Sequence, residues 1–161
     1  MNGQWSYNSN NTGVQASTCT ASGSYSTAMG DGTTASGDYS TSMGRSTAAS
    51  ALYSTAMGRS TAASALYSTA MGYGTDASGY FSTAMGSSTT ASALYSTAMG
   101  DGTIASGSRS TAMGSYTTAS DYASLSIGRY NSVNSTVTAG GSATSFDTDN
   151  AAFVIGNGTG S

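Results

Sequence analysis

The sequence predicts an all-β fold, a parallel β-solenoid built from short stacked strands, and three observations support this prediction. Methionine recurs with a 14-residue period, glycine follows each of these methionines, and an Ala-Ser pair keeps the same period from Ala21-Ser22 to Ala119-Ser120. So short a unit cannot hold a pair of helices, which needs more than roughly 30 residues. Glycine is not at every third position and no heptad stripe of apolar residues is present, so collagen and coiled-coil folds are excluded.

Each repeat unit, such as residues 53–66, is expected to hold two strands joined by two tight turns. The first strand is predicted at residues 54–58 (Ser-Thr-Ala-Met-Gly) and the second at residues 61–65 (Thr-Ala-Ala-Ser-Ala). Threonine favours strands, and glycine permits the backbone angles of sharp corners. Neighbouring strands lie about 4.8 Å apart, so eight to nine coils would form a rod on the order of 40 Å long.

The second strand indicates which side chains face the interior of the coil. The position of Ala62 varies most between units and accepts both Asp76 and Ile104, so we expect it to face solvent. Because side chains alternate along a strand, Thr61 and Ala63 are then expected to point inward.

The first strand places methionine outside the coil, since only small residues fit inside so narrow a unit. We expect Ala56 and Gly58 to point inward and Met57 to point outward. The resulting row, called here the methionine stripe, consists of Met29, Met43, Met57, Met71, Met85, Met99, Met113 and Ile127. A continuous apolar stripe of this size predicts contact with another chain. The alternative is a monomeric rod in which methionine fills the coil.

The period and the Ser-x-Ala-Met/Ile-Gly strand resemble the head repeats of trimeric autotransporter adhesins. The resemblance extends over about residues 12–130, and Ser124–Gly128 (Ser-Leu-Ser-Ile-Gly) is nearest to the form usual in that family. It implies a left-handed parallel β-roll, a homotrimer with the methionine stripe on the trimer axis, and an extracellular position at the bacterial outer membrane.

Three segments are expected along the chain. Residues 1–11 are predicted to be a cap or a binding tip, with Trp5 and Tyr7; residues 12–130 are predicted to be the β-roll head. Residues 131–161 are rich in Asn, Ser, Thr and Gly, and we expect an irregular extension at a fragment boundary. Its stretch 151–159 resembles the segment that follows such repeats in bacterial fibres carrying a tail-spike-type chaperone.

Composition argues against several functions. The net charge is −3 with only four Lys and Arg residues, so we expect no nucleic-acid partner. No apolar run approaches the length of a membrane span and the N-terminus does not resemble a signal peptide, so this segment is not expected to insert into a membrane. Histidine is absent, which removes the usual catalytic base, and no enzyme activity, cofactor or metal site is predicted.

Two local features have more than one interpretation. Cys19 occupies a threonine position of the repeat and is expected to be a small buried substitute rather than a reactive thiol. The cluster at residues 147–150 (Asp-Thr-Asp-Asn) is interpreted as an Asx turn, with a calcium site as the alternative.

One repeated position forms an aromatic ladder, which consists of Tyr25, Tyr39, Tyr53, Tyr67, Phe81 and Tyr95. The rings are expected to stack along the rod or to pack against a neighbouring chain. Alternatively they face a ligand, a sugar or a protein surface, together with Leu52, Leu66 and Leu94. Arg45 and Arg59 stack as like charges, which suggests an anionic partner.

The leading functional hypothesis is adhesion, in which a trimeric rod presents many weak contacts to a glycan or protein on a host, prey or matrix surface. The alternative is a passive spacer in a cell-surface or phage tail fibre. A further alternative is a monomeric ice-binding solenoid, because the threonine row from Thr33 to Thr117 resembles the hydroxyl arrays of such proteins.

Overall fold

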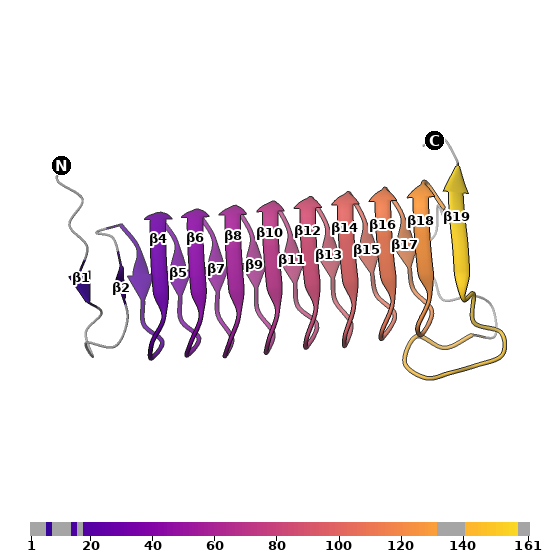
Figure 1. The fold of residues 1–161 in the computed structure, drawn as a ribbon, viewed down its shortest axis with the longest axis horizontal. Helices are drawn as coiled ribbons and strands as arrows, with labels where there is room; N and C mark the ends of the chain where they lie inside the picture. Colours follow the sequence, from indigo (N-terminus) through magenta and orange to yellow (C-terminus); the bar gives the residue numbers. More distant parts are fainter. Residues whose placement is uncertain (1–5, 8–13, 16–17, 132–140, 158–161) are drawn as a thin grey trace.

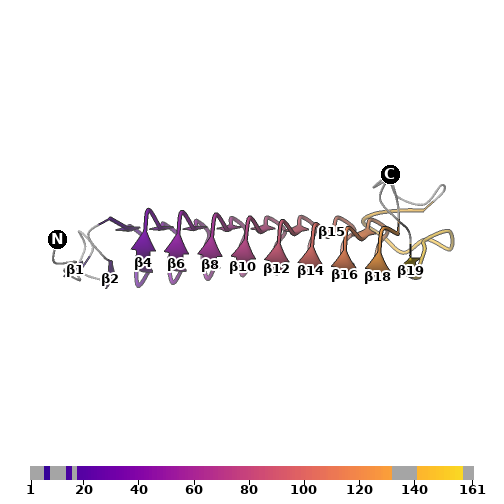
Figure 2. The same cartoon turned by 90° about the horizontal axis from the view of Figure 1, so that it is seen from above.

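The chain forms a flat rod of stacked coils in the computed structural model, which describes residues 6–7, 14–15, 18–131 and 141–157 (Figure 1). Residues 6–7, 14–15 and 157 are described by their backbone alone. Trp5 lies outside the described residues. Seen from above, the body of the rod is thin, with the strands of the two sheets lying close together (Figure 2). Within the described residues no helix is long and apolar enough to cross a membrane.

Two sheets run along the rod. Sheet A comprises, in spatial order, β1 (Ser6–Tyr7), β2 (Val14–Gln15), β4 (Thr27–Asp31), β6 (Thr41–Arg45), β8 (Thr55–Arg59), β10 (Thr69–Tyr73), β12 (Thr83–Ser87), β14 (Thr97–Asp101), β16 (Thr111–Ser115), β18 (Leu125–Arg129) and β19 (Phe153–Asn157). Sheet B comprises β3 (Thr20–Ala21), β5 (Thr34–Ala35), β7 (Ala48–Ala49), β9 (Ala62–Ala63), β11 (Asp76–Ala77), β13 (Thr90–Ala91), β15 (Ile104–Ala105) and β17 (Thr118–Ala119). The predicted all-β parallel solenoid is therefore confirmed.

The coils stack in strict register with the 14-residue period. Met71 pairs with Met57 on one side and with Met85 on the other, and every neighbouring pair from β4 to β18 is parallel in the same way. The N-terminal edge of sheet A differs, since β2 pairs parallel with β4 at a spacing of 13 residues and β1 pairs antiparallel with β2. Equal unit lengths therefore place equivalent side chains directly above one another.

The strand lengths differ from the prediction in the second half of each unit. The first strand has five residues, as in Thr55–Arg59, but the second has only two, as in Ala62–Ala63. The predicted five-residue second strand is wrong because the chain bends again at Ala65. Ladder bonding nevertheless continues on both sides of the short strand, where Ser64 N donates to Ala77 O at 3.1 Å.

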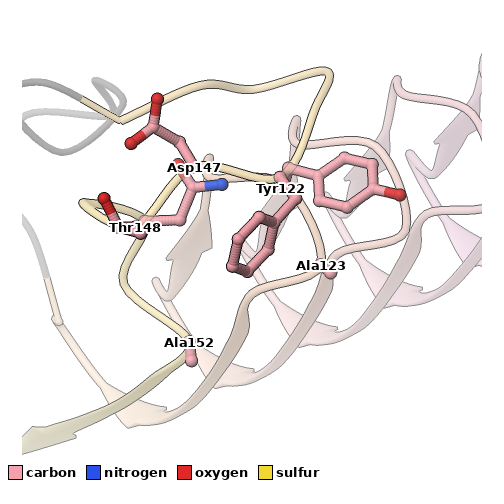
Figure 3. Close-up of a pocket in the computed structure, with 7 residues that line it drawn as sticks. Tyr122, Ala123, Asp147, Thr148 and Ala152 are labelled. Atoms are coloured by element: carbon pink, nitrogen blue, oxygen red, sulfur yellow. The ribbon is translucent and has the colours of Figure 1, made fainter.

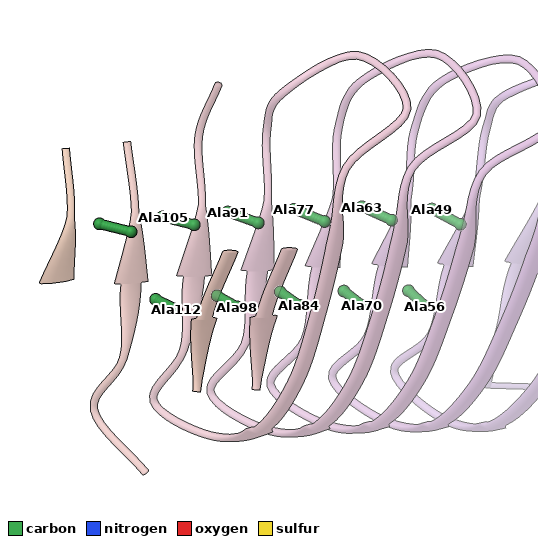
Figure 4. Packing of buried hydrophobic residues seen from close by; sticks show 11 residues of the cluster. Ala49, Ala56, Ala63, Ala70, Ala77, Ala84, Ala91, Ala98, Ala105 and Ala112 are labelled. Carbon is green, nitrogen blue, oxygen red and sulfur yellow. The ribbon is translucent and has the colours of Figure 1, made fainter. Parts of the chain in front are cut away.

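The interior of the coil is filled by alanine, as Figure 4 shows for the central coils. Ala56 and Ala63 are fully buried, together with their equivalents in the other coils. Thr61 is also buried, which confirms the predicted inward face of the second strand. The prediction for Gly58 is wrong: this residue is exposed, because its φ of 123° interrupts the alternation that Ala56 follows.

The buried threonines form one row of interior polar groups, in addition to the buried serines. Hydroxyl groups of Thr33, Thr61, Thr75, Thr89, Thr103 and Thr117 have no hydrogen-bond partner in the described part of the chain. Thr47 differs, because Ser42 takes the place of an interior alanine and its Oγ lies 2.7 Å from Thr47 Oγ1. A buried hydroxyl without a partner costs about 1–3 kcal/mol. Because every threonine of the row from Thr33 to Thr117 is buried, the row offers no hydroxyl array to ice.

The repeat resumes after an inserted loop at the C-terminal end. Phe153 pairs with Leu125 and Ile155 with Ile127, so β19 continues sheet A at a shift of two periods of the repeat. The extension expected to be irregular thus contains a strand of the sheet. Its sequence holds the signal, since the Phe-Val-Ile-Gly of residues 153–156 has the same apolar-x-apolar-Gly pattern as Leu125–Gly128.

Sheet B ends at β17, where a side chain takes the place of the next strand. The Asn131 amide accepts a hydrogen bond from Thr118 N at 2.6 Å and donates one to Thr118 O at 2.8 Å. In the preceding coil, Ile104 N donates instead to the backbone carbonyl of Thr117. Asn131 therefore closes the exposed edge that an ended sheet would otherwise present.

Candidate functional site

The methionine stripe lies on the outer face of sheet A. Met57 and most of its equivalents are half-buried, and Met113 is 37% exposed. The alternative in which methionine fills the coil is wrong, because alanine and serine occupy the interior of sheet A instead. The stripe continues onto β19 through Ile155, which is 66% exposed, and beside it Phe153 is 55% exposed.

The stripe is flat because the strands stack without a register shift. Thr55 and Met57 point to the same outer face, so a threonine row runs beside the methionine row. Each methionine is flanked in register by the methionines of the neighbouring coils, as Met71 is by Met57 and Met85. The result is a long, flexible apolar strip, since the thioether chain adapts to varied partners.

The aromatic ladder lies at the turn that precedes each strand of sheet A. Neighbouring rings stack with centroid separations of 4.8–5.1 Å and interplanar angles of 7–19°, from Tyr25 to Tyr95. Each ladder residue has a left-handed backbone, with φ of 55–58°. Backbone bonds between coils fix this geometry, as where Tyr53 N donates to Asp38 O at 2.9 Å. The predicted stacking along the rod is confirmed.

The stacking limits what the ladder can bind. Both faces of an inner ring such as Tyr53 are covered by the neighbouring rings, so a sugar cannot stack on them. The rings nevertheless remain 43–62% exposed, which means that they present their edges and hydroxyl groups. Arg109 takes the ladder position in the next coil, and its guanidinium lies 5.5 Å from the Tyr95 ring centre and 5.3 Å from that of Tyr122.

A second apolar row runs beside the ladder. Leu52 and Leu94 are exposed and Leu66 is half-buried, and Tyr80 occupies the equivalent position between Leu66 and Leu94. The sequence indicated the three leucines, but it did not single out Tyr80. The repeat spacing is the signal that identifies it, since Tyr80 lies one full period after Leu66.

Arg45 and Arg59 lie side by side in register at the opposite edge of sheet A, as the repeat predicts. Arg45 Nε lies 3.5 Å from Asp31 Oδ2, although both side chains are well exposed. Arg59 instead lies over the ring of Tyr73, at 5.4 Å from its centre. The suggestion of an anionic partner at this edge stays a prediction.

A hollow of about 360 Å³ lies between the last turn of the rod and the inserted loop, and Figure 3 shows it from close by. Tyr122 and Phe146 form its apolar wall. Its polar groups are engaged in the loop itself: Asp147 Oδ1 accepts a hydrogen bond from Asp149 N at 3.0 Å, and Asn150 Oδ1 accepts one from Ser142 N at 2.6 Å. The predicted Asx turn is confirmed, and among the described residues no cluster of metal-ligating side chains is found.

The remaining sequence candidates are placed as follows. Tyr7 lies in β1, of which only the backbone is described, and Trp5 lies outside the described residues, so their ligand-binding role stays a prediction. Cys19 is buried, as expected, and its Sγ donates to the carbonyl oxygen of Gly30 at 3.2 Å. The methionine stripe and the aromatic ladder are two separate surfaces of the same rod, the first on the outer face of sheet A and the second at the turn before its strands.

Comparison with known proteins agrees with this architecture. The family model of the YadA head domain repeat matches four stretches of the chain, each spanning two copies of the repeat, at residues 21–47, 49–75, 77–103 and 105–131. Together they cover about two thirds of the sequence. No curated protein matches the chain. The resemblance of residues 151–159 to chaperone-bearing fibres stays a prediction.

Proposed function

Because the chain belongs to the family of YadA head domain repeats, we propose that it is the head of a trimeric fibre that mediates adhesion by multivalent contacts. This is a family of head repeats from bacterial cell-surface adhesins and not an enzyme family, and it favours surface display over a phage fibre. The observation that supports the proposal is the methionine stripe, which extends along the outer face of sheet A from β4 to β18.

An alanine core alone gives each coil little hydrophobic stabilisation. Buried apolar surface contributes roughly 25 cal/mol per Å², and alanine offers a small area. Three rods that bring their methionine stripes together on one axis would add the large apolar side chains that the coil interior lacks. The same contact would cover Ile155 and Phe153, which are otherwise highly exposed for side chains of their type.

The trimer leaves repeated surfaces for adhesion. Its contacts with a glycan or protein are weak and numerous, so no deep pocket is needed, and linking three chains raises the avidity by about 10²–10⁴. Among foreign ligands, a protein surface or a hydrogen-bonding glycan fits the aromatic ladder better than a sugar stacked on a ring face, because only the ring edges are open.

The molar mass in solution tests the assembly. Light scattering on the eluting protein should give three chains, and Met71→Asp with Met85→Asp should give one chain, because six carboxylates would meet on the axis. Ser64→Asp on the opposite, exposed face is the matched control and should remain trimeric. A monomeric wild-type protein would overturn the proposed trimer.

Binding separates adhesion from the role of a passive spacer. The trimer should bind at least one member of a panel of glycans and matrix proteins, and the monomeric double variant should bind the same target much more weakly. A trimer that binds no member of such a panel and no cells would favour the spacer.

A further inference from the structure

The two apolar rows at the turn form one exposed ridge along the middle of the rod. The ridge consists of Leu52, Tyr53, Leu66, Tyr67, Tyr80, Phe81, Leu94 and Tyr95. The side chains of all but the half-buried Leu66 are 38–59% exposed. The ridge lies at the edge of sheet A, beside the methionine stripe and separate from it. Within the described part of the chain, no segment covers these side chains.

Opposite charges stand at the two ends of the ridge. Asp38 occupies the position of Leu52 one coil earlier, and Arg109 occupies the position of Tyr95 one coil later. Both side chains are exposed, and the ion pair found among the described residues, Arg45 with Asp31, lies at the other edge. Asp38 Oδ1 accepts a hydrogen bond from Ser24 N at 2.8 Å, which holds the carboxylate at the turn.

We propose that the ridge is a pairing surface for the ridge of a second copy of this chain, in antiparallel orientation. A two-fold axis between the coils of Leu66 and Tyr80 makes the ridge complementary to itself. Leu66 then lies opposite Tyr80 of the second copy, and Arg109 lies opposite the turn that carries Asp38. The pairing therefore closes with an ion pair at each end of the contact.

The charges select the antiparallel orientation. In a parallel pair each Asp38 would lie near the Asp38 of the second copy, and each Arg109 near the other Arg109. Like charges brought together at an interface cost several kcal/mol, whereas the antiparallel pair brings opposite charges together. The two rods must therefore approach with their N-termini pointing in opposite directions.

The spacing of the rings favours a second copy over another protein. The ladder repeats every 4.8–5.1 Å, so only a surface with the same repeat stays in register along the whole ridge. Each large aromatic side chain can bury roughly 150–250 Å². Eight half-exposed apolar side chains thus offer on the order of 600–800 Å² per copy, close to the roughly 800 Å² per partner of a stable interface.

This pairing goes beyond the proposed trimer and does not depend on adhesion to a foreign surface. It joins assembled units, so light scattering should show a molar mass that rises with protein concentration. If the basic unit is a monomer, its single ridge limits the mass to two chains. If the basic unit is a trimer, each of its three ridges can pair with another trimer, and the mass rises to six chains and beyond. Failure of the trimer and failure of the pairing are therefore distinguishable.

Charge reversal tests the orientation. Asp38→Arg and Arg109→Asp should each raise the concentration needed for half-association by about tenfold or more, because like charges meet at both ends. The variant carrying both changes should regain most of the association, since the ion pairs are restored with reversed sign. Arg59→Asp at the opposite edge is the matched control and should associate like the wild type. Circular dichroism checks that each variant is folded.

Cross-linking gives an independent result in a Cys19→Ser background. A mixture of Leu66→Cys and Tyr80→Cys proteins should form mixed disulfide-linked pairs in preference to either protein with itself. Preferential linkage of Leu66→Cys with itself would indicate parallel pairing and overturn the proposal. A mass that stays constant at all concentrations, or a doubly reversed variant no better than the single ones, would overturn it as well.

Discussion

Replacing Gly72 by alanine is expected to destabilise the rod severely, because two independent constraints apply at this position. Gly72 has a φ of 121°, which side chains rarely adopt and which costs about 1–3 kcal/mol for a residue other than glycine. A Cβ built on it would lie 2.0 Å from the carbonyl oxygen of Gly86 in the next coil. Relieving that overlap means separating two coils and losing about two ladder hydrogen bonds, worth about 0.5–1.5 kcal/mol each.

The two effects together predict a loss of about 2–6 kcal/mol, a large share of the roughly 5–15 kcal/mol that stabilises a typical domain. Gly74→Ala is the matched control. Gly74 has a φ of 61°, but the nearest atom to its added Cβ is Ser88 Oγ at 3.7 Å. Ser60 and Ser88 occupy the equivalent position with φ of 54° and 52°, so this control should lose only about 1–2 kcal/mol.

Thermal unfolding followed by circular dichroism measures the difference, and hydrogen exchange of the β10 and β12 amides locates it. The Gly72→Ala protein should melt well below the Gly74→Ala protein, with fast exchange at the affected coils. Equal melting temperatures for the two variants would refute the reasoning that close approach of the backbones requires glycine after each methionine.

Two further predictions concern the interior and the end of sheet B. Ser42→Ala should lower the free energy of unfolding by about 1–3 kcal/mol, because it leaves the Thr47 hydroxyl without a partner. Ser126→Ala should be neutral or stabilising, because the Ser126 hydroxyl has no partner in the described part of the chain. Thermal unfolding measures both. An equal loss in both would show that the Ser42 hydrogen bond contributes nothing. Asn131→Ala should accelerate hydrogen exchange at the Thr118 amide, since that amide donates to the Asn131 side chain, and Asn131→Asp should protect it better than alanine does because an acceptor remains. Unchanged exchange in the alanine variant would contradict the capping role.

Much of the fold could be predicted because the repeat fixes both spacing and direction. The interval between Met57 and Met71 fixes the coil length, and the variability of the Ala62 position identifies the outer face of sheet B. Gly58 was placed wrongly because alternation assumes extended backbone angles, and the sequence alone does not show that this glycine has a φ of 123°. The short second strand was missed for a similar reason, since the onset of the bend depends on backbone geometry rather than on residue type.

The surfaces were harder to predict than the coil. The methionine stripe and the aromatic ladder follow from spacing alone, but covered ring faces become evident only when the ring separations are known. Asn131 could not have been identified, because an asparagine that replaces a strand looks like any asparagine in a loop. Tyr80 and β19 could have been predicted from the sequence, since both follow the spacing of the repeat.

The uniform register of sheet A also means that the rod can change length in whole steps. Residues 45–58 and 59–72 have identical sequences, as expected if one unit had been copied entire. Removal of residues 58–71 would join Met57 directly to Gly72 and leave every row of side chains unbroken, with the rod shorter by one spacing of about 4.8 Å. Whole repeat units can therefore be gained or lost in the gene without changing the packing between coils, and the length of the rod can change one coil at a time.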